Sequence, residues 1–170
     1  RRSLKRVVIN SVVKADRKGT GALIHTVINN DTMFMTKVPD GTTYPGVKVS
    51  MKDMEAEGDI LHEDYQRDMH LLLEASTLTG KIVSGTAEGW NAICREKGFG
   101  VYIIDPQGYN MVHGVNMTLK SGSIWNVTGE STLTALTIDD GADIKSPSGK
   151  KLIMRVNGAI VPVAPGTYKG

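Results

Sequence analysis

The sequence predicts an all-β fold in which short strands are stacked as the coils of a β-solenoid. Three observations lead to this prediction. Valine, isoleucine and threonine, which favour strands, make up about a quarter of the 170 residues. Nineteen glycines, together with Asp, Asn, Ser and Pro, separate the apolar segments at short intervals, as turns separate strands. A pattern of apolar and small residues also recurs at a nearly regular interval.

The composition limits the class of protein. The length suits one domain with a hydrophobic core, and we expect a single domain over residues 1–170. Twenty Lys and Arg against 18 Asp and Glu argue against electrostatic recruitment by nucleic acid or an anionic membrane. Without a long apolar run, no membrane span is expected. Because the chain begins at Arg1 rather than Met, we expect a processed or excised part of a larger protein.

The first two copies of the repeat are residues 49–60 and, 22 positions later, residues 71–82. Each copy has two apolar residues in alternation, a polar turn, a small residue and a second apolar pair. The corresponding positions are Val49 and Leu71, Met51 and Leu73, Ala56 and Leu78, Gly58 and Gly80, and Ile60 and Ile82.

Two further copies follow at residues 117–126 and 136–142, after intervals of 46 and 19 positions. An interval of 46 equals two units, so the unit has about 19 to 23 residues. Met117 and Leu119 correspond to Leu71 and Leu73, Ile124 to Leu78, Asn126 to Gly80, Leu136 to Met117, and Ile138 to Leu119. We therefore expect Met51, Leu73, Leu119 and Ile138 to stack in one ladder.

A unit of this length without helical periodicity suits one coil of a solenoid, in which alternate residues of each strand point inward onto the next coil. About seven coils, spaced by roughly 4.8 Å, would form a rod about 30 Å long. A β-sandwich is an alternative, but it does not require equivalent residues at a fixed interval. A second alternative is an amphipathic helix over residues 59–75, where Leu61, Tyr65, Met69, Leu72 and Leu73 recur at near-helical spacing.

At the C-terminal end, Asn157 and Gly158 separate two short apolar segments, which is the strongest short-range signal for a β-hairpin. We expect this hairpin to fold across the last coil as a cap that blunts its exposed edge. Pro162 and Pro165 are expected to interrupt further pairing.

Residues 119–144 contain the pattern S-x-W-x-V-T-G-x-S-x-L-x-x-L-x-x-x-x-G-A-x-I. This pattern is similar to the rungs of right-handed parallel β-helices on bacterial surfaces, in autotransporter passengers and in pectate-lyase-like adhesin or carbohydrate-binding modules. The resemblance covers residues 115–170 best, 47–82 less well and 1–46 least, and residues 83–114 depart from it. It implies a right-handed parallel β-helix in an extracellular or cell-surface location, and it carries over no catalytic residue.

The densest cluster of ionisable residues is at positions 62–70, where Glu63, Asp64 and Asp68 offer enough oxygen atoms for a hard cation such as calcium. The alternative for these residues is a solvated turn between coils. The second acidic cluster, residues 139–143, occupies the turn position of the repeat, and we expect a plain turn there rather than a calcium loop.

The longest break in the repeat is residues 84–100, and loops on a rigid scaffold often carry binding residues. Trp90 is the candidate for stacking on a sugar ring, with Asn91, Arg95 and Glu96 as hydrogen-bonding partners. The alternative is that Trp90 covers the end of the core.

These observations favour a non-enzymatic surface module for adhesion or glycan binding, with a polysaccharide or a host glycoprotein as its partner. One alternative is a polysaccharide lyase or hydrolase that uses Asp64 and Asp68 with a base from a neighbouring coil. The other is a structural stalk whose open coil edges associate end to end. Apart from calcium, we expect no cofactor.

Overall fold

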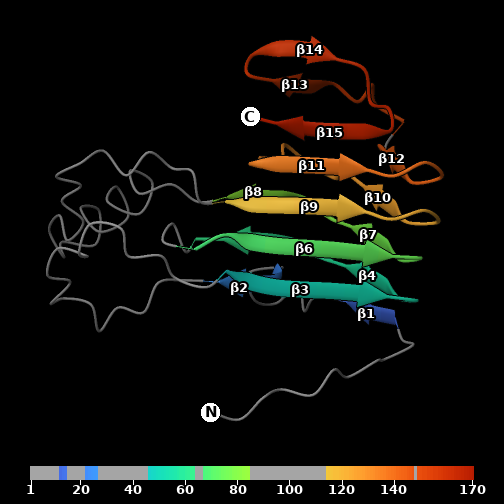
Figure 1. Ribbon diagram of the computed structural model, residues 1–170. Coiled ribbons are helices and arrows are strands. Elements are labelled where there is room, and N and C mark those ends of the chain that lie inside the picture. The colour runs from blue at the N-terminus through green and yellow to red at the C-terminus, as the bar shows by residue number, and fades with distance from the viewer. Residues whose placement is uncertain (1–11, 15–21, 27–45, 64–66, 85–113, 148) are drawn as a thin grey trace, which may run out of the picture.

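Figure 1 shows the computed structural model of the protein as an all-β structure whose strands are stacked one above another. The structure describes residues 12–14, 22–26, 46–63, 67–84, 114–147 and 149–170. These ranges contain no helix, and in particular none that could cross a membrane. The prediction of an all-β fold is confirmed for the described residues, and the alternative helix is wrong for the described part of residues 59–75.

One sheet contains four parallel strands and an antiparallel fifth strand at one edge. Its strands are, in spatial order, β3 (Val47–Lys52), β6 (Met69–Glu74), β9 (Val115–Leu119), β11 (Ala135–Ile138) and β15 (Gly166–Lys169). Met51 pairs with Leu73, Leu73 with Leu119, and Leu119 with Ile138, and all four side chains are buried. The predicted ladder is therefore confirmed. The interpretation of the interval of 46 as two units is wrong, because β6 pairs directly with β9 and no strand of this sheet lies between them.

Two further sheets consist of parallel strands. The second sheet contains β1 (Val12–Lys14), β4 (Glu55–Glu57), β7 (Thr77–Thr79), β10 (Ile124–Asn126) and β12 (Asp143–Lys145), and the third contains β2 (Ala22–Thr26), β5 (Asp59–His62) and β8 (Ile82–Ser84). From β3 to β8 the chain enters the three sheets in turn and then returns to the first sheet one strand further along. The longest parallel series among the described residues has five strands, whereas about seven coils were expected.

The repeat predicts most of the register but not all of it. Ala56 pairs with Leu78, and Ile60 pairs with Ile82, as the interval of 22 predicts. The next pairing is shifted by one position, because Trp125 rather than Ile124 pairs with Leu78. The prediction for Ile124 is wrong because the turn at residues 120–123 is one residue longer than the preceding one. Shifting a strand by one residue exchanges its inner and outer faces, so Trp125 is buried.

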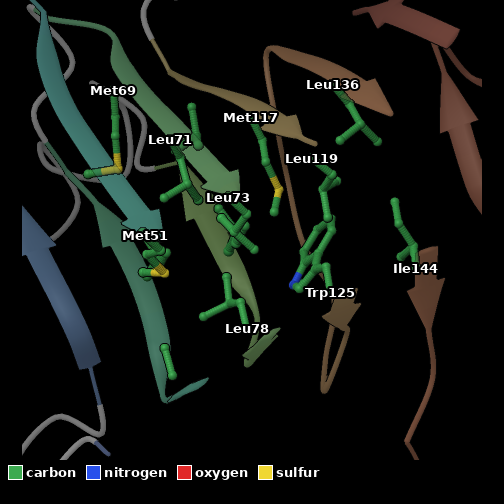
Figure 2. Packing of buried hydrophobic residues seen from close by; sticks show 14 of the residues in the cluster. Met51, Met69, Leu71, Leu73, Leu78, Met117, Leu119, Trp125, Leu136 and Ile144 are labelled. Atoms are coloured by element: carbon green, nitrogen blue, oxygen red, sulfur yellow. The ribbon is translucent and has the colours of Figure 1, made fainter. Parts of the chain in front are cut away.

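The core is formed by alternate residues of the three sheets. Figure 2 shows side chains of the first and second sheets meeting in the space between them. Along β6, Met69, Leu71 and Leu73 are buried, whereas His70 is exposed. This period of two explains why a strand forms here despite the helical spacing of the leucines. The fully buried residues are Ile60, Met69, Leu71, Leu73, Leu78, Ile82, Met117, Leu119, His62, Val115 and Ser123.

The C-terminal segment contains the predicted hairpin, formed by β13 (Met154–Val156) and β14 (Ala159–Val161). Asn157 and Gly158 both have positive φ angles, of 48° and 82°, as a tight hairpin turn requires. We expected the hairpin to cover the edge of the last parallel strand, β11, but it does not pair with that edge. That edge pairs with β15, which begins directly after Pro165, so the two prolines do not end the pairing.

Candidate functional site

Three segments of the chain join the described structure at one corner, defined by the C-terminal ends of β2, β5 and β8 and by the beginnings of β3, β6 and β9. Parallel pairing places these strand ends side by side. Residues 27–45, 64–66 and 85–113 connect the two sets of ends. Backbone hydrogen bonds of 2.8 Å from Val47 to Asp68 and 2.9 Å from Met69 to Gly114 align the returning strands. The corner therefore gathers the connections whose lengths differ most.

His62 lies inside this corner and is 1 % exposed. One ring nitrogen, Nε2, is 2.7 Å from the carbonyl oxygen of Arg67, and because a carbonyl can only accept, Nε2 carries a hydrogen. The other nitrogen, Nδ1, is 2.6 Å from the hydroxyl oxygen of Thr26 on the neighbouring strand. His62 thus fastens β5 both to β2 and to the chain that returns into β6. These contacts give it a structural role.

Two of the three predicted metal ligands, Glu63 and Asp68, are among the described residues. Glu63 accepts a hydrogen bond from His25, with 2.7 Å between Oε2 and Nε2, and both side chains are about one-third exposed. Asp68 accepts a hydrogen bond of 3.1 Å from the backbone N–H of Gly114 through Oδ1. Asp64 lies outside the described residues. The described ranges hold no group of three His, Cys, Asp or Glu side chains arranged for a metal ion.

The predicted sugar-binding residues, Trp90, Asn91, Arg95 and Glu96, also lie outside the described residues. The described residues nearest to them in sequence, Ser84 and Gly114, belong to the corner. The hydroxyl of Ser84 accepts a hydrogen bond of 3.1 Å from the backbone N–H of Val115. The chain therefore leaves the corner and returns to it at nearly the same point.

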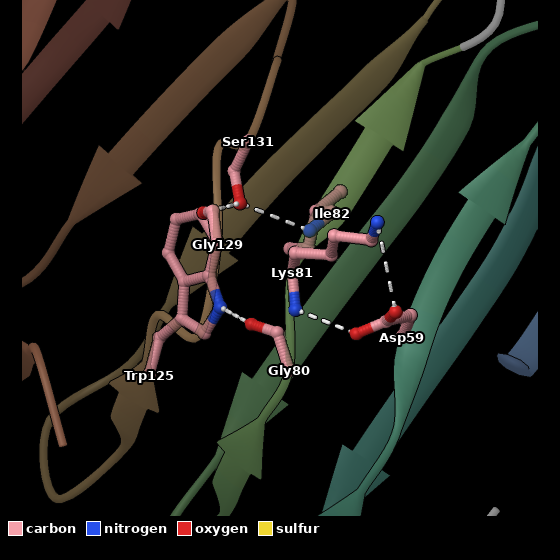
Figure 3. Close-up of polar contacts among 7 residues, drawn as sticks. All are labelled: Asp59, Gly80, Lys81, Ile82, Trp125, Gly129 and Ser131. Carbon is pink, nitrogen blue, oxygen red and sulfur yellow. Dashed lines mark hydrogen bonds and ion pairs between the residues drawn. The ribbon is translucent and has the colours of Figure 1, made fainter. Parts of the chain in front are cut away.

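The chain at residues 129–134 takes the place beside β8 that another strand of the third sheet would occupy (Figure 3). The Ser131 hydroxyl accepts a hydrogen bond of 3.1 Å from the backbone N–H of Ile82 and donates one to the carbonyl oxygen of Gly129. The indole N–H of Trp125 donates to the carbonyl oxygen of Gly80, at 3.0 Å. The backbone N–H of Thr132 donates to the carbonyl oxygen of Ile82 at 2.8 Å, so side chains and backbone together satisfy this edge of β8.

A cleft of about 550 Å³ lies between this segment, the C-terminal hairpin and β15. The apolar residues that line it include Trp125, Leu136, Ile144, Leu152, Ile153, Met154, Val163 and Tyr168, and the charged or amide residues are Glu130, Arg155, Asn157 and Lys169. Tyr168 is held by a hydrogen bond of 2.8 Å from its hydroxyl to the carbonyl oxygen of Ala164. With one carboxylate in its lining, the cleft suits an apolar ligand group better than paired acid–base chemistry.

The second acidic cluster forms a turn, as predicted. The N–H of Ala142 bonds to the carbonyl oxygen of Asp139 at 3.0 Å, and Gly141 has a positive φ of 79°. The carboxylate of Asp139 pairs with Lys120 at 3.1 Å, and that of Asp143 pairs with Lys145 at 3.1 Å. Both carboxylates therefore form ion pairs with partly exposed lysine side chains.

Sequence reasoning did not find the C-terminal cleft. Its walls come from residues 125–136 and 144–170, which are adjacent only after β15 has turned back onto β11. Comparisons of the chain with protein-family models, with curated protein sequences and with solved structures give no match. The candidate sites are therefore assigned from the geometry of this chain alone.

Proposed function

We propose that the chain is a right-handed parallel β-helix that works as a non-enzymatic surface module, binding a polysaccharide or a host glycoprotein outside the cell. In this proposal the stacked sheets supply a rigid rod. The residues that recognise the ligand lie on the connections at the corner formed by the ends of β2, β5 and β8.

The arrangement of these connections is the observation that carries the proposal. The inner ladder from Met51 to Ile138 stays in register although the connections between its strands differ greatly in length. Two of the three connections at the corner, residues 27–45 and 85–113, are long, and long connections from one side of a fixed scaffold are typical of binding sites. The β-helix itself is supported by the order in which the chain enters the three sheets, since parallel crossovers are overwhelmingly right-handed.

The chemistry of the described residues favours binding over catalysis. A glycan lyase or hydrolase needs carboxylates or a base converging on one bond. Glu63 and Asp68 each have a separate partner at the corner. The C-terminal cleft has Glu130 as its one carboxylate.

The alternative of a structural stalk, in which copies of the chain associate end to end, is less well supported at the C-terminal end. An open parallel edge on β11 would be needed to continue that sheet into a second copy. The antiparallel strand β15 occupies that edge, from Ala135 paired with Lys169 to Ile138 paired with Gly166. The rod is therefore better suited to presenting a binding surface than to forming a filament through this sheet.

Retention on immobilised polysaccharides and host glycoproteins tests the proposal, with Trp90→Ala compared against the unchanged chain. We expect the variant to release a bound ligand at least tenfold more readily. The reason is that the apolar face of a sugar ring stacks on an indole ring. Ile160→Ala, which removes an exposed apolar side chain from the hairpin, is the matched control and should retain the ligand. Equal retention of every ligand by Trp90→Ala, or product release from a uronate polymer, would contradict the proposal.

A further inference from the structure

The outer face of the C-terminal hairpin carries two large aliphatic side chains, although it faces solvent. Ile153 and Ile160 are 52 % and 68 % exposed and are the large hydrophobic side chains most exposed among the described residues. Arg155 pairs directly with Ile160 across the hairpin and is also exposed. Met154 and Val161, on the opposite face, are half-buried and form the next cross-strand pair. A sheet face that meets solvent normally carries polar residues, so two exposed isoleucines beside Arg155 are unusual there.

The charge of this region is strongly one-sided. The last of the 18 acidic residues is Asp143, and every charged residue after it is basic. Lys145 is paired with Asp143, whereas no described carboxylate pairs with Lys150, Lys151 or Arg155. The near balance of the whole chain therefore conceals a cationic C-terminal segment, and the two exposed isoleucines belong to this segment.

We propose that this face of the hairpin docks on an anionic lipid surface. Cationic side chains around exposed aliphatic side chains match a layer of anionic headgroups above an acyl region. The hairpin lies at one extreme of the stacked strands in Figure 1, so the face can meet a flat surface without obstruction by the sheets. An acidic polysaccharide would satisfy the cations but leave Ile153 and Ile160 in water. An added peptide strand would find only three residues on β14.

Co-sedimentation with vesicles tests this proposal on the full 170-residue chain. The probes are vesicles of equal parts phosphatidylglycerol and phosphatidylcholine, vesicles of phosphatidylcholine alone, and soluble polygalacturonate. We expect binding to the anionic vesicles, weaker binding at high salt, and little binding to the neutral vesicles or the polymer. Replacing Lys150, Lys151 and Arg155 together by Gln should lower partitioning about a hundredfold, at about fivefold per charge.

The apolar half of the proposal is tested by the double variant Ile153→Ser and Ile160→Ser, for which we expect a loss of about tenfold or more. Lys48→Gln, which removes an exposed cation from β3, is the control and should bind almost as the unchanged chain does. Equal melting curves would show that the variants remain folded. Equal binding to neutral and anionic vesicles, unchanged binding by both hairpin variants, or binding to polygalacturonate alone would overturn the proposal. None of these outcomes depends on the corner used for glycan binding.

Discussion

Gly80 lies against the backbone of Gly58, so closely that a Cβ atom on Gly80 would be 2.0 Å from the carbonyl oxygen of Gly58. The two glycines occupy equivalent positions in consecutive copies of the repeat, between the second and third sheets. Their close approach lets the chain bend from one sheet into the next while the strands on both sides stay in register. It also fixes the position of the carbonyl that Trp125 uses.

Gly80→Ala should destabilise the protein by about 3 kcal/mol, because the methyl group can be accommodated only if two backbone segments separate. Urea denaturation followed by circular dichroism measures this change. Gly129→Ala is the matched control, since its Cβ would meet only the flexible side chain of Lys81 at 3.4 Å. We expect a change below about 1 kcal/mol for the control. Equal stabilities of the two variants would contradict the close packing at Gly80.

Leu73→Ala should lower the free energy of unfolding by about 3 kcal/mol, because Leu73 is fully buried in the centre of the inner ladder. Leu72→Ala, one residue earlier on the same strand, removes the same atoms from the half-buried outer face. Its cost should be about 1 kcal/mol. Denaturation of both variants provides the measurement. A larger loss for Leu72 than for Leu73 would mean that the faces of β6 are reversed.

The shifted register at Trp125 can be tested by fluorescence. The chain has two tryptophans, so Trp90→Phe leaves Trp125 as the one emitting indole. Because Trp125 is 4 % exposed, its emission should be blue-shifted and resistant to iodide quenching. Unfolding in urea should remove both properties. Red-shifted, readily quenched emission from the folded variant would place Ile124, rather than Trp125, inside.

Removal of calcium should leave the melting temperature unchanged. The reason is that Glu63 and Asp68 already have separate partners, His25 and the N–H of Gly114. Thermal melts in chelator and in millimolar calcium provide the measurement. A ligand present at 100 times its dissociation constant adds about 2.7 kcal/mol of stability, so a bound ion would raise the melting temperature by several degrees. Such a rise would contradict this prediction and would support a calcium site at these residues.

The sequence predicts the ladder well because each of its members obeys two rules at once. Met51, Leu73, Leu119 and Ile138 are apolar residues in alternating segments, and the intervals of 22 and 19 positions at the two ends of the series are close to one coil. The hairpin is equally predictable, since Asn157 and Gly158 are the residues that tolerate positive φ angles.

Other features depend on distances that no local pattern contains. One extra residue at Gly122 in the turn before β10 is enough to exchange the roles of Ile124 and Trp125. The pairing of β15 with β11 joins residues about 30 positions apart in antiparallel order, which the parallel repeat does not anticipate. The cleft beside Tyr168 follows from that pairing, so it too was missed.

The corner at the ends of β2, β5 and β8 has a practical consequence. Residues 64–66 connect Glu63 to Arg67, and His62 is hydrogen-bonded both to Thr26 on β2 and to the carbonyl oxygen of Arg67. The neighbouring connection runs through residues 85–113 without disturbing the alignment of β6 with β9. A foreign epitope grafted between Glu63 and Arg67 would therefore be displayed from a framework whose strands stay aligned when a neighbouring connection is long.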